Sequence, residues 1–405
     1  MIWNPLLTDV AEIKEIETVI YKIANGLGRT GNNSFTHSSD VSLMYGKFGS
    51  ALFYAYLYRY SADKAHYETF DSLLDESFQL MSGMDAQLSF GRGHAGFAWC
   101  LQHLALSGFL DADIDEMVTD VSDKLYALTD YFLEKGDYDY LLGGLGPAVY
   151  LLERAKAGNI DLFLKKVVTH LEALAFCDDG GDYFWEQVLH DAPPRINLGI
   201  AHGIPGLLVI LSKCYRLGIE PEICSRLIDG GYAFLMKSKM KDAPSCYAFS
   251  IQDGHFEGST PLRWCYGDLG ISIAFLTVGQ NMGRSEWQEE GIRLGLSCAA
   301  RLQKELPTLA DAHFCHGSAG VGHVLTRLYH HTGLDAFRDG ALFCLKDTLR
   351  RVVSIDDYIT FVADKGDFGK LHIDGLMEGS TGIALCLLAL IDKNEPAWDS
   401  CFLLS

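Results

Sequence analysis

Apolar runs recur along the chain, and each follows the same short glycine pattern. In seven places a Gly-x-x-Gly motif leads directly into an apolar run that is long enough for a buried helix. The first glycines of these motifs lie 47 to 64 residues apart, at Gly46, Gly93, Gly143, Gly203, Gly267, Gly317 and Gly379. Two further copies, at Gly28 and Gly366, lack the apolar run. The regular spacing and the shared helix, more than the glycines alone, therefore indicate an internal repeat.

A second kind of segment precedes each of these runs. It has the 3.6-residue periodicity of an amphipathic helix, with charged positions on one face. The segments run approximately over residues 11–25, 66–82, 113–135, 161–175, 220–240, 286–305 and 335–352. Each repeat is thus expected to comprise a charged outer helix, a connection, the Gly-x-x-Gly motif and an apolar inner helix.

Helical hairpins of this kind must stack, because none can bury its apolar face alone. An open array would have atypical polar repeats at its ends, yet the first and last repeats keep the pattern. We therefore expect an all-α fold and a single domain over residues 1–405. In it seven hairpins, about fourteen helices, close into a double-ring barrel with the apolar helices inside.

The glycines are expected to set the mouth of this barrel. Lacking Cβ, they allow neighbouring helix ends to approach closely where the chain turns into an inner helix. The residues just before them then ring the mouth, near the positive ends of the helix dipoles. These residues are Tyr45, Arg92, Leu142, His202, Tyr266, His316 and Glu378, and all of them except Leu142 are polar. Connections at 176–197, 242–263 and 354–375, rich in Gly, Asp and Pro, are expected to be loops that wall the mouth.

Composition narrows the class of protein. A chain of 405 residues with 48% hydrophobic residues can bury a large core. The first residues lack the basic and apolar regions of a signal peptide, so the eleven cysteines are expected to be reduced thiols in the cytoplasm. No apolar run is long enough to span a bilayer. The net charge of −20 argues against nucleic-acid binding and favours cationic partners such as basic peptides.

Two of the cysteines share a register. Cys265 and Cys315 each stand two residues before a Gly-x-x-Gly motif, and His316 follows Cys315. If the two repeats are neighbours, two thiols and an imidazole meet in one place. Such a set suits zinc and leaves the fourth coordination position open, as in a catalytic site. The alternative is that both are ordinary buried cysteines beside helix-start glycines; the shared register and the adjacent histidine favour the metal.

Three motifs then resemble a known family. Asn197-Leu-Gly-Ile-Ala-His-Gly-Ile-Pro-Gly206, Trp264-Cys-Tyr-Gly267 and Cys315-His-Gly317, on the sevenfold array, are similar to those of the lanthionine synthetase C-like cyclases. The resemblance covers essentially the whole chain. It implies an α/α toroid and one Zn²⁺ ion bound by Cys265, Cys315 and His316. It further implies lantibiotic biosynthesis, in which peptide cysteines add to dehydroalanine or dehydrobutyrine and form (methyl)lanthionine thioether rings.

This chemistry needs an activated thiol and a proton source. The pKa of a free thiol is about 8.5, and binding to zinc would deprotonate it. Attack on the β-carbon produces an enolate, which needs stabilisation and a proton at the α-carbon. His202 is the first candidate for the proton donor, because the pKa of imidazole is about 6.5. The alternative is that His202 is a packed structural histidine. Asp139 resembles the family's motif aspartate and would orient His202 or take the thiol proton, unless it is a helix N-cap.

Two more residues are candidates. Tyr266 is expected to hydrogen-bond the enolate or a metal ligand. The family usually has an arginine four residues before the first zinc cysteine, where this chain has Pro261. Arg263 lies two residues before that cysteine. It is the candidate in this chain for stabilising the enolate or holding Asp139.

The resemblance also implies partners. Since only one helix precedes the first repeat, we expect a stand-alone bacterial-type cyclase with a separate dehydratase, a leader-bearing dehydrated precursor peptide and an export transporter. The protein would be cytoplasmic, at the periphery of a membrane-associated complex. Two alternatives remain open. One is the eukaryotic branch of the family, linked to glutathione, although that branch tends to have His where Tyr266 stands. The other is a non-catalytic, zinc-stabilised scaffold that binds peptides.

Overall fold

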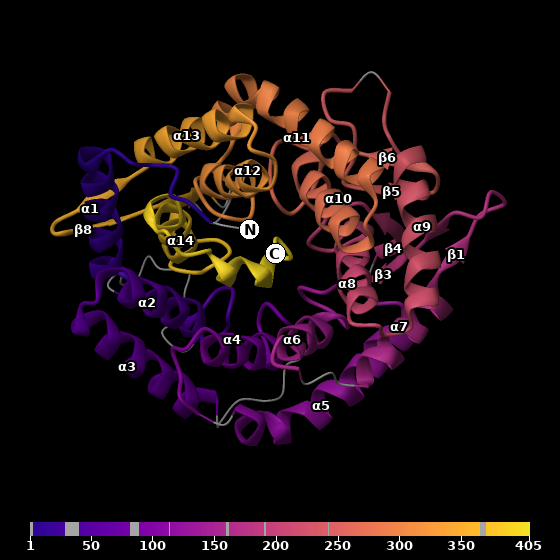
Figure 1. Cartoon of the computed structure of the whole chain (residues 1–405), viewed down its shortest axis with the longest axis horizontal. Coiled ribbons are helices and arrows are strands. Elements are labelled where there is room, and N and C mark those ends of the chain that lie inside the picture. Colours follow the sequence, from indigo (N-terminus) through magenta and orange to yellow (C-terminus); the bar gives the residue numbers. More distant parts are fainter. Residues whose placement is uncertain are drawn as a thin grey trace. The chain divides into compact units, whose positions relative to one another are not determined.

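The computed structural model describes residues 3–28, 40–81, 89–112, 114–158, 162–189, 192–241, 243–364 and 370–405. Within these ranges the regular structure is mainly helical, with fourteen α-helices (Figure 1). Several expected positions lie outside the described residues: the segment ends at Ser82, Asp113 and Asp161, the loop start at Asp242, and Gly366.

The apolar runs form inner helices that are buried along most of their length. They are α2 (Lys47–Ser61), α4 (His94–Leu106), α6 (Gly146–Ala155), α8 (Ile204–Arg216), α10 (Asp268–Met282), α12 (Ser318–Thr332) and α14 (Ser380–Ile391). Six of them begin directly after the first glycine of their motif, as expected. The exception is α6, which begins at Gly146 because a turn held by the side chain of Asp139 occupies the residues before it.

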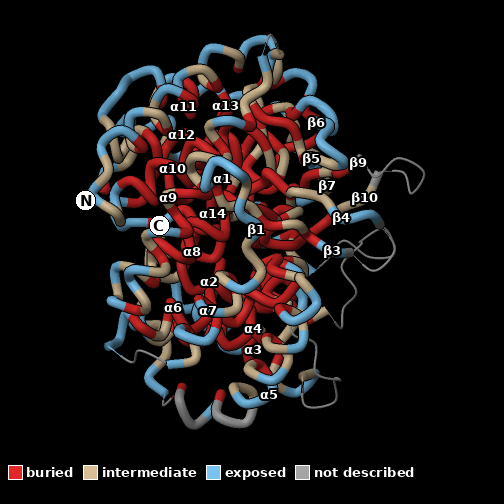
Figure 2. The backbone as a smooth tube through the Cα atoms, turned by 90° about the vertical axis from the view of Figure 1, so that its right-hand side faces the viewer, coloured by how far each residue is buried: buried red, intermediate tan, exposed pale blue. Residues whose placement is uncertain are grey.

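The amphipathic segments form the outer helices. They are α1 (Val10–Gly26), α3 (Lys64–Met81), α5 (Ile114–Glu134), α7 (Phe163–Leu174), α9 (Pro221–Lys237), α11 (Ser285–Glu305) and α13 (Asp335–Arg350), and their ends fall within three residues of the expected ones. Two short 3₁₀ helices, η2 (Leu306–Thr308) and η4 (Ala397–Phe402), follow α11 and α14. In Figure 2 buried residues (red) run along apolar helices such as α8 and α14, which confirms that these apolar runs form buried helices.

The chain forms two compact units. The first comprises Met1–Asp85, Leu262–Trp264 and Leu296–Trp398, and the second comprises Ala86–Pro261, Cys265–Gly295 and Asp399–Ser405. In the first unit α14 packs against both α12 and α2. In the second unit α4, α6, α8 and α10 form a row of inner helices, each in contact with the next. The expectation of one domain over residues 1–405 stays a prediction.

Packing between inner and outer helices differs from the expected hairpin in its order. Four of the described inner helices pack on the outer helix that follows them: α2 on α3, α4 on α5, α8 on α9 and α12 on α13. The helix α6 instead contacts both α5 and α7. The reason is the length of the connections: only two residues separate α2 from α3, whereas the long connections lead from outer to inner helices. The outer helix α1 packs on α14, the last inner helix among the described residues.

The long connections are not simple loops, because they contain short antiparallel strands. In the second unit β1 (Phe176–Cys177) pairs with β2 (Tyr183–Phe184). A four-stranded sheet in the same unit has the order β3 (Gln187–Leu189), β4 (Ala192–Asn197), β5 (Ser250–Gln252) and β6 (His255–Glu257). In the first unit β7 (Val353–Ile355) pairs with β8 (Tyr358–Thr360), and β9 (Val362–Asp364) with β10 (Lys370–His372). Most of these strands have two or three residues, too few to show alternation, and β4 contains Pro193 and Pro194, which argue against a strand in the sequence.

None of the described helices combines the length and the apolar character that crossing a bilayer requires.

Candidate functional site

Two of the expected proton-handling residues meet in the second unit. His202 lies just before Gly203, the N-cap of α8, and Asp139 lies in the turn before α6. The Nδ1 atom of His202 is 2.7 Å from Oδ2 of Asp139. Because a carboxylate only accepts, Nδ1 carries the proton of this hydrogen bond. Among the described residues Nε2 of His202 has no hydrogen-bond partner, and about a fifth of the side chain is exposed. That nitrogen can therefore face a substrate.

The pKa of His202 reflects a competition. Burial acts to lower it, because it disfavours the imidazolium. The charge of Asp139 and the hydrogen bond to it act in the opposite direction and prevail, so the pKa of His202 lies above its ordinary value. More of this imidazole is protonated at neutral pH than in a free histidine. The electrostatics thus suit a proton donor.

Asp139 has the geometry of an orienting group. Its Oδ1 accepts hydrogen bonds from the backbone N–H groups of Leu141 (2.8 Å) and Leu142 (3.0 Å). Its Oδ2 accepts from His202 and, at 3.4 Å, from Nε2 of Gln187. Four donors use the acceptor capacity of a carboxylate. The alternative of a helix N-cap does not hold, because Leu145 occupies that position of α6.

Tyr266 completes this group. Its ring centroid lies 5.7 Å from that of His202, and its hydroxyl oxygen accepts a hydrogen bond of 3.2 Å from Nδ2 of Asn197, the last residue of β4. Burial raises the pKa of the Tyr266 phenol, although the hydrogen bond from Asn197 acts against this. The hydroxyl is therefore neutral at physiological pH and able to donate.

Two glycines bring these segments together. A Cβ atom at residue 199 would stand 2.5 Å from the carbonyl oxygen of Cys265, so only glycine fits where the chain before α8 meets the Cys265–Tyr266 segment. Gly267 has a φ of +81°, and a Cβ there would stand 2.2 Å from Oγ1 of Thr260. The N–H of Ala201 also donates to the carbonyl of Cys265 at 3.3 Å. The motif glycines thus hold Tyr266 beside His202.

Sequence reasoning missed two residues of this group. Gln187 is 2% exposed and touches Asp139 and Asn197 through its amide. Arg195 pairs with Gln187 in the register of β3 and β4, and its positive charge lowers the pKa of both His202 and Tyr266. Both lie in a connection that was expected to be a loop. The polar residues in that connection were the only available signal, because their position depends on strands too short to predict.

Arg263 lies in the first unit and is half-buried. Its expected contact with the enolate or with Asp139 stays a prediction.

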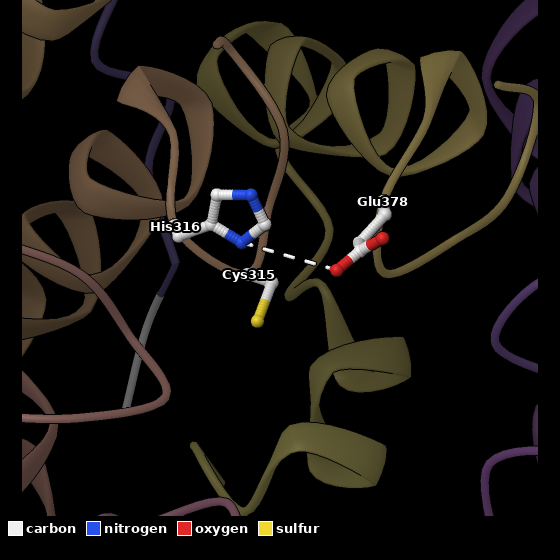
Figure 3. A group of neighbouring side chains, drawn as sticks. All are labelled: Cys315, His316 and Glu378. Carbon is white, nitrogen blue, oxygen red and sulfur yellow. Dashed lines mark ion pairs between the residues drawn. The ribbon is translucent and has the colours of Figure 1, made fainter. Parts of the chain in front are cut away.

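A second group lies in the first unit, just before two inner helices. One ligand atom from each of Cys315, His316 and Glu378 lies within 4.8 Å of the other two (Figure 3). Cys315 and His316 come from the turn before α12, and Glu378 comes from the turn before α14. The N–H of Cys315 donates to the carbonyl of Met377 at 3.0 Å and so ties the two turns together. The sequence predicted Glu378 to lie at the mouth of the barrel, because it directly precedes a motif glycine, but it predicted no chemical role for this residue.

His316 is oriented by a buried carboxylate. Its Nε2 lies 3.0 Å from Oδ2 of Asp311, while its Nδ1 lies 4.0 Å from Oε1 of Glu378. Burial acts to raise the pKa of Asp311, but the hydrogen bond from His316 and the nearby charge of His313 hold it well below its usual range. A metal-ligating histidine typically donates its other ring nitrogen to a carboxylate in this way. Nδ1 is then the nitrogen turned toward Glu378.

The donor set fits zinc. A thiolate, an imidazole nitrogen and a carboxylate oxygen are the three kinds of ligand that Zn²⁺ takes in proteins. Cys265, the other expected ligand, is a buried residue of the second unit. Trp264 directly precedes it and belongs to the first unit, where its N–H donates to the carbonyl of Cys315 at 3.2 Å. Cys265 as a ligand stays a prediction.

Comparison with solved structures shows the fold. Nisin cyclase matches with a TM-score of 0.69 at 17% identity, and the match covers 98% of each chain. A GH76 α-mannanase from Bacteroides thetaiotaomicron matches with a TM-score of 0.50 at 11% identity, over 94% of this chain and 97% of that one. A possible GH105 family member from Salmonella enterica matches with a TM-score of 0.47 at 13% identity, over 96% of each chain. The fold class is the expected α/α toroid.

A search of the curated proteins found no match to the chain, whereas a protein-family model does match it. The model of the lanthionine synthetase C-like protein family matches residues 37–403, which is most of the chain. This range contains every candidate residue described above. The chain therefore belongs to the lanthionine synthetase C-like family.

Proposed function

We propose that this protein is a zinc-dependent peptide cyclase that forms lanthionine and methyllanthionine rings. It adds cysteine thiols of a ribosomal precursor peptide to dehydroalanine or dehydrobutyrine residues of the same peptide. The observation that carries the proposal is the 2.7 Å hydrogen bond between His202 and Asp139, which leaves Nε2 of a partly exposed imidazole free next to Tyr266. Family membership and the fold shared with nisin cyclase support it.

Cys265, Cys315 and His316 would hold the metal. Asp311 fixes the ring of His316 and so selects its Nδ1 for this purpose. A zinc ion bound there supplies positive charge that lowers the pKa of the substrate thiol. Glu378 is a further ligand candidate, because its carboxylate lies with Cys315 and His316 in one group.

The other residues act on the electrophile. As the substrate sulfur bonds to the β-carbon, the electron pair of the double bond moves toward the carbonyl and forms an enolate. Tyr266 donates a hydrogen bond to the enolate oxygen, which stabilises charge where it develops. Protonated His202, held at Nδ1 by Asp139, gives its Nε2 proton to the α-carbon. Arg195 adds a positive charge close to both residues. Arg263 stays a candidate for the same stabilisation.

The substrate class implies partners. The precursor peptide would carry a leader, and a separate dehydratase must supply its dehydrated residues. An export transporter and a cytoplasmic location beside a membrane-associated complex complete the proposal.

Ring closure has a direct test. A dehydrated precursor peptide is incubated with the zinc-loaded protein and then treated with a thiol-alkylating reagent. The mass before alkylation should stay unchanged while the number of alkylated cysteines falls. The His202→Ala variant, with zinc content verified, should lose most of this activity. Equal ring formation by the variant would contradict the assigned proton donor, and no loss of thiols with the wild type would contradict the cyclase activity.

A further inference from the structure

A chain of hydrogen bonds in the second unit has a direction that the backbone fixes. The N–H of Gly199 donates to Oδ1 of Asn197 at 3.0 Å. A backbone N–H can only donate, so this atom of the Asn197 amide is the oxygen and the other is the nitrogen. The orientation of the Asn197 amide therefore does not depend on any neighbouring side chain.

The next two bonds inherit this direction. Nδ2 of Asn197 has two protons, and it lies 3.2 Å from Oε1 of Gln187 and 3.2 Å from the hydroxyl oxygen of Tyr266. Because Oε1 of Gln187 accepts, the other end of that amide is the nitrogen. This nitrogen donates to Oδ2 of Asp139 at 3.4 Å. Oδ2 of Asp139 thus accepts hydrogen bonds from both Gln187 and His202.

The direction has a consequence for Tyr266. Its oxygen already accepts a proton from Asn197, so its own single proton must point elsewhere. Among the described residues no group accepts that proton. Asn197 is 1% exposed and Gln187 is 2% exposed, so water cannot easily rearrange the amides. The Tyr266 hydroxyl, whose ring lies 5.7 Å from that of His202, is therefore preset as a hydrogen-bond donor.

We infer that Asn197 and Gln187 are positioning residues that fix Tyr266 as the hydrogen-bond donor to the substrate oxyanion. The same two amides keep Asp139 in the role of acceptor, so that it orients His202 rather than removing a proton. This inference rests on the proposed cyclase activity, in which the oxyanion is the enolate. It gives a positioning role to Asn197, which belongs to a sequence motif, and to Gln187, which belongs to none.

The sharpest test is a substitution that keeps shape and reverses direction. In Asn197→Asp the carboxylate still accepts from Gly199, but its second oxygen now accepts from Tyr266 as well. The hydroxyl proton turns away from the substrate. We expect kcat to fall by about 100-fold, the loss typical for one oxyanion donor, with little change in KM. Tyr266→Phe should show a similar fall.

The double variant separates positioning from general damage. If Asn197 acts through the Tyr266 hydroxyl, the losses of kcat in Asn197→Asp and Tyr266→Phe should be far from additive in the double variant, which keeps only the smaller loss that passes through Gln187. A matched control is Asn281→Asp, because Asn281 donates to Ser212 and accepts from Arg216 elsewhere in the same unit. The control should retain wild-type kcat. Gln187→Met, which removes both amide contacts without adding charge, should lower kcat by about tenfold.

A readout that needs no turnover covers the case of an inactive protein. With tyrosine labelled at Cζ, the resonance that is missing in Tyr266→Phe identifies Tyr266. Asn197→Asp should shift this resonance, because the Tyr266 hydroxyl then donates a hydrogen bond to residue 197 instead of accepting one from it. A folded Asn197→Asp variant with kcat within threefold of wild type, additive losses in the double variant, or an unshifted resonance would each overturn the inference. Absence of ring formation by the wild type, together with the expected shift, would instead count against the proposed function.

Discussion

His202 and Asp139 show how a few atoms set the chemistry at the residue scale. The sequence could identify both, because each lies at a motif position. It could not tell whether Asp139 orients or removes a proton, since that depends on four donors brought by the turn at Leu141 and Leu142, by Gln187 and by His202. It also could not reveal Arg195, whose effect on His202 and Tyr266 is electrostatic and depends on β4.

The pH dependence of ring formation should report the pKa of His202. Protonated His202 gives up a proton, so the rate should fall as pH rises through its pKa. Asp139 raises that pKa, whereas burial lowers it. Asp139→Asn removes the charge and keeps the burial, so the alkaline fall of kcat should move to lower pH by about one unit or more. An unmoved alkaline limb would contradict the assignment of His202 as the proton donor.

Asp137 gives a prediction about stability. Burial, with the charge of Asp139, raises the pKa of Asp137 to about 6. The folded state thus binds this proton more tightly than the unfolded chain, so its stabilising contribution is present at low pH and is lost as pH rises through about 6. Asp137→Asn should raise the free energy of unfolding by about 2 kcal/mol at pH 7.5. Urea denaturation should show this gain shrinking between pH 6 and pH 4; a gain independent of pH would contradict the assigned cause.

Glu378 gives a prediction about the metal. If it is a ligand or holds one, Glu378→Gln should weaken zinc affinity by about tenfold or more. Competition against a chromophoric chelator measures this without any turnover. Glu76→Gln is a suitable control, because Glu76 belongs to the same unit and pairs with Lys47 on the surface. Equal zinc affinity in the two variants would remove Glu378 from the site.

At the scale of elements, the helices were predictable and their pairing was not. Glycine motifs and apolar runs placed the inner helices, and amphipathic periodicity placed the outer ones. The packing of α1 on α14 joins residues from opposite ends of the first unit's sequence, and no local pattern encodes such a contact. The strands at the site were missed because β3 is only three residues long and β4 contains two prolines.

The segment before α1 should be essential to the last inner helix. Trp3 is 5% exposed, donates from Nε1 to the carbonyl of Ala389 at 3.3 Å, and stacks on His330 with ring centroids 3.7 Å apart. The N–H groups of Leu6 and Leu7 also donate to the carbonyl of Leu390. Trp3→Ala should therefore lower the free energy of unfolding by about 3–5 kcal/mol. Val10→Ala, at an exposed position of α1, is a control that should change it by less than about 0.5 kcal/mol; similar values for both would show that the segment is not docked.

At the scale of the whole molecule, repetition explains why the sequence indicated the fold. Seven copies of one pattern are more informative than any single helix, and the family match and nisin cyclase agree with the result. Each candidate group draws on segments far apart in the sequence: Asp139, His202 and Tyr266 in the second unit, and Cys315, His316 and Glu378 in the first. The motif residues of both groups were accessible from the sequence, whereas Gln187, Arg195 and the orienting role of Asp311 were not.

The most direct measurement of the central claim is ring formation in D₂O. Each closure by the proposed route places one solvent-derived proton on an α-carbon, so each ring formed in D₂O should retain about one deuterium after return to H₂O. We expect the zinc-loaded wild type to consume alkylatable thiols and to incorporate deuterium in equal number, and His202→Ala to do neither at a comparable rate. A wild-type protein that consumes no thiols and introduces no stable deuterium would contradict the account.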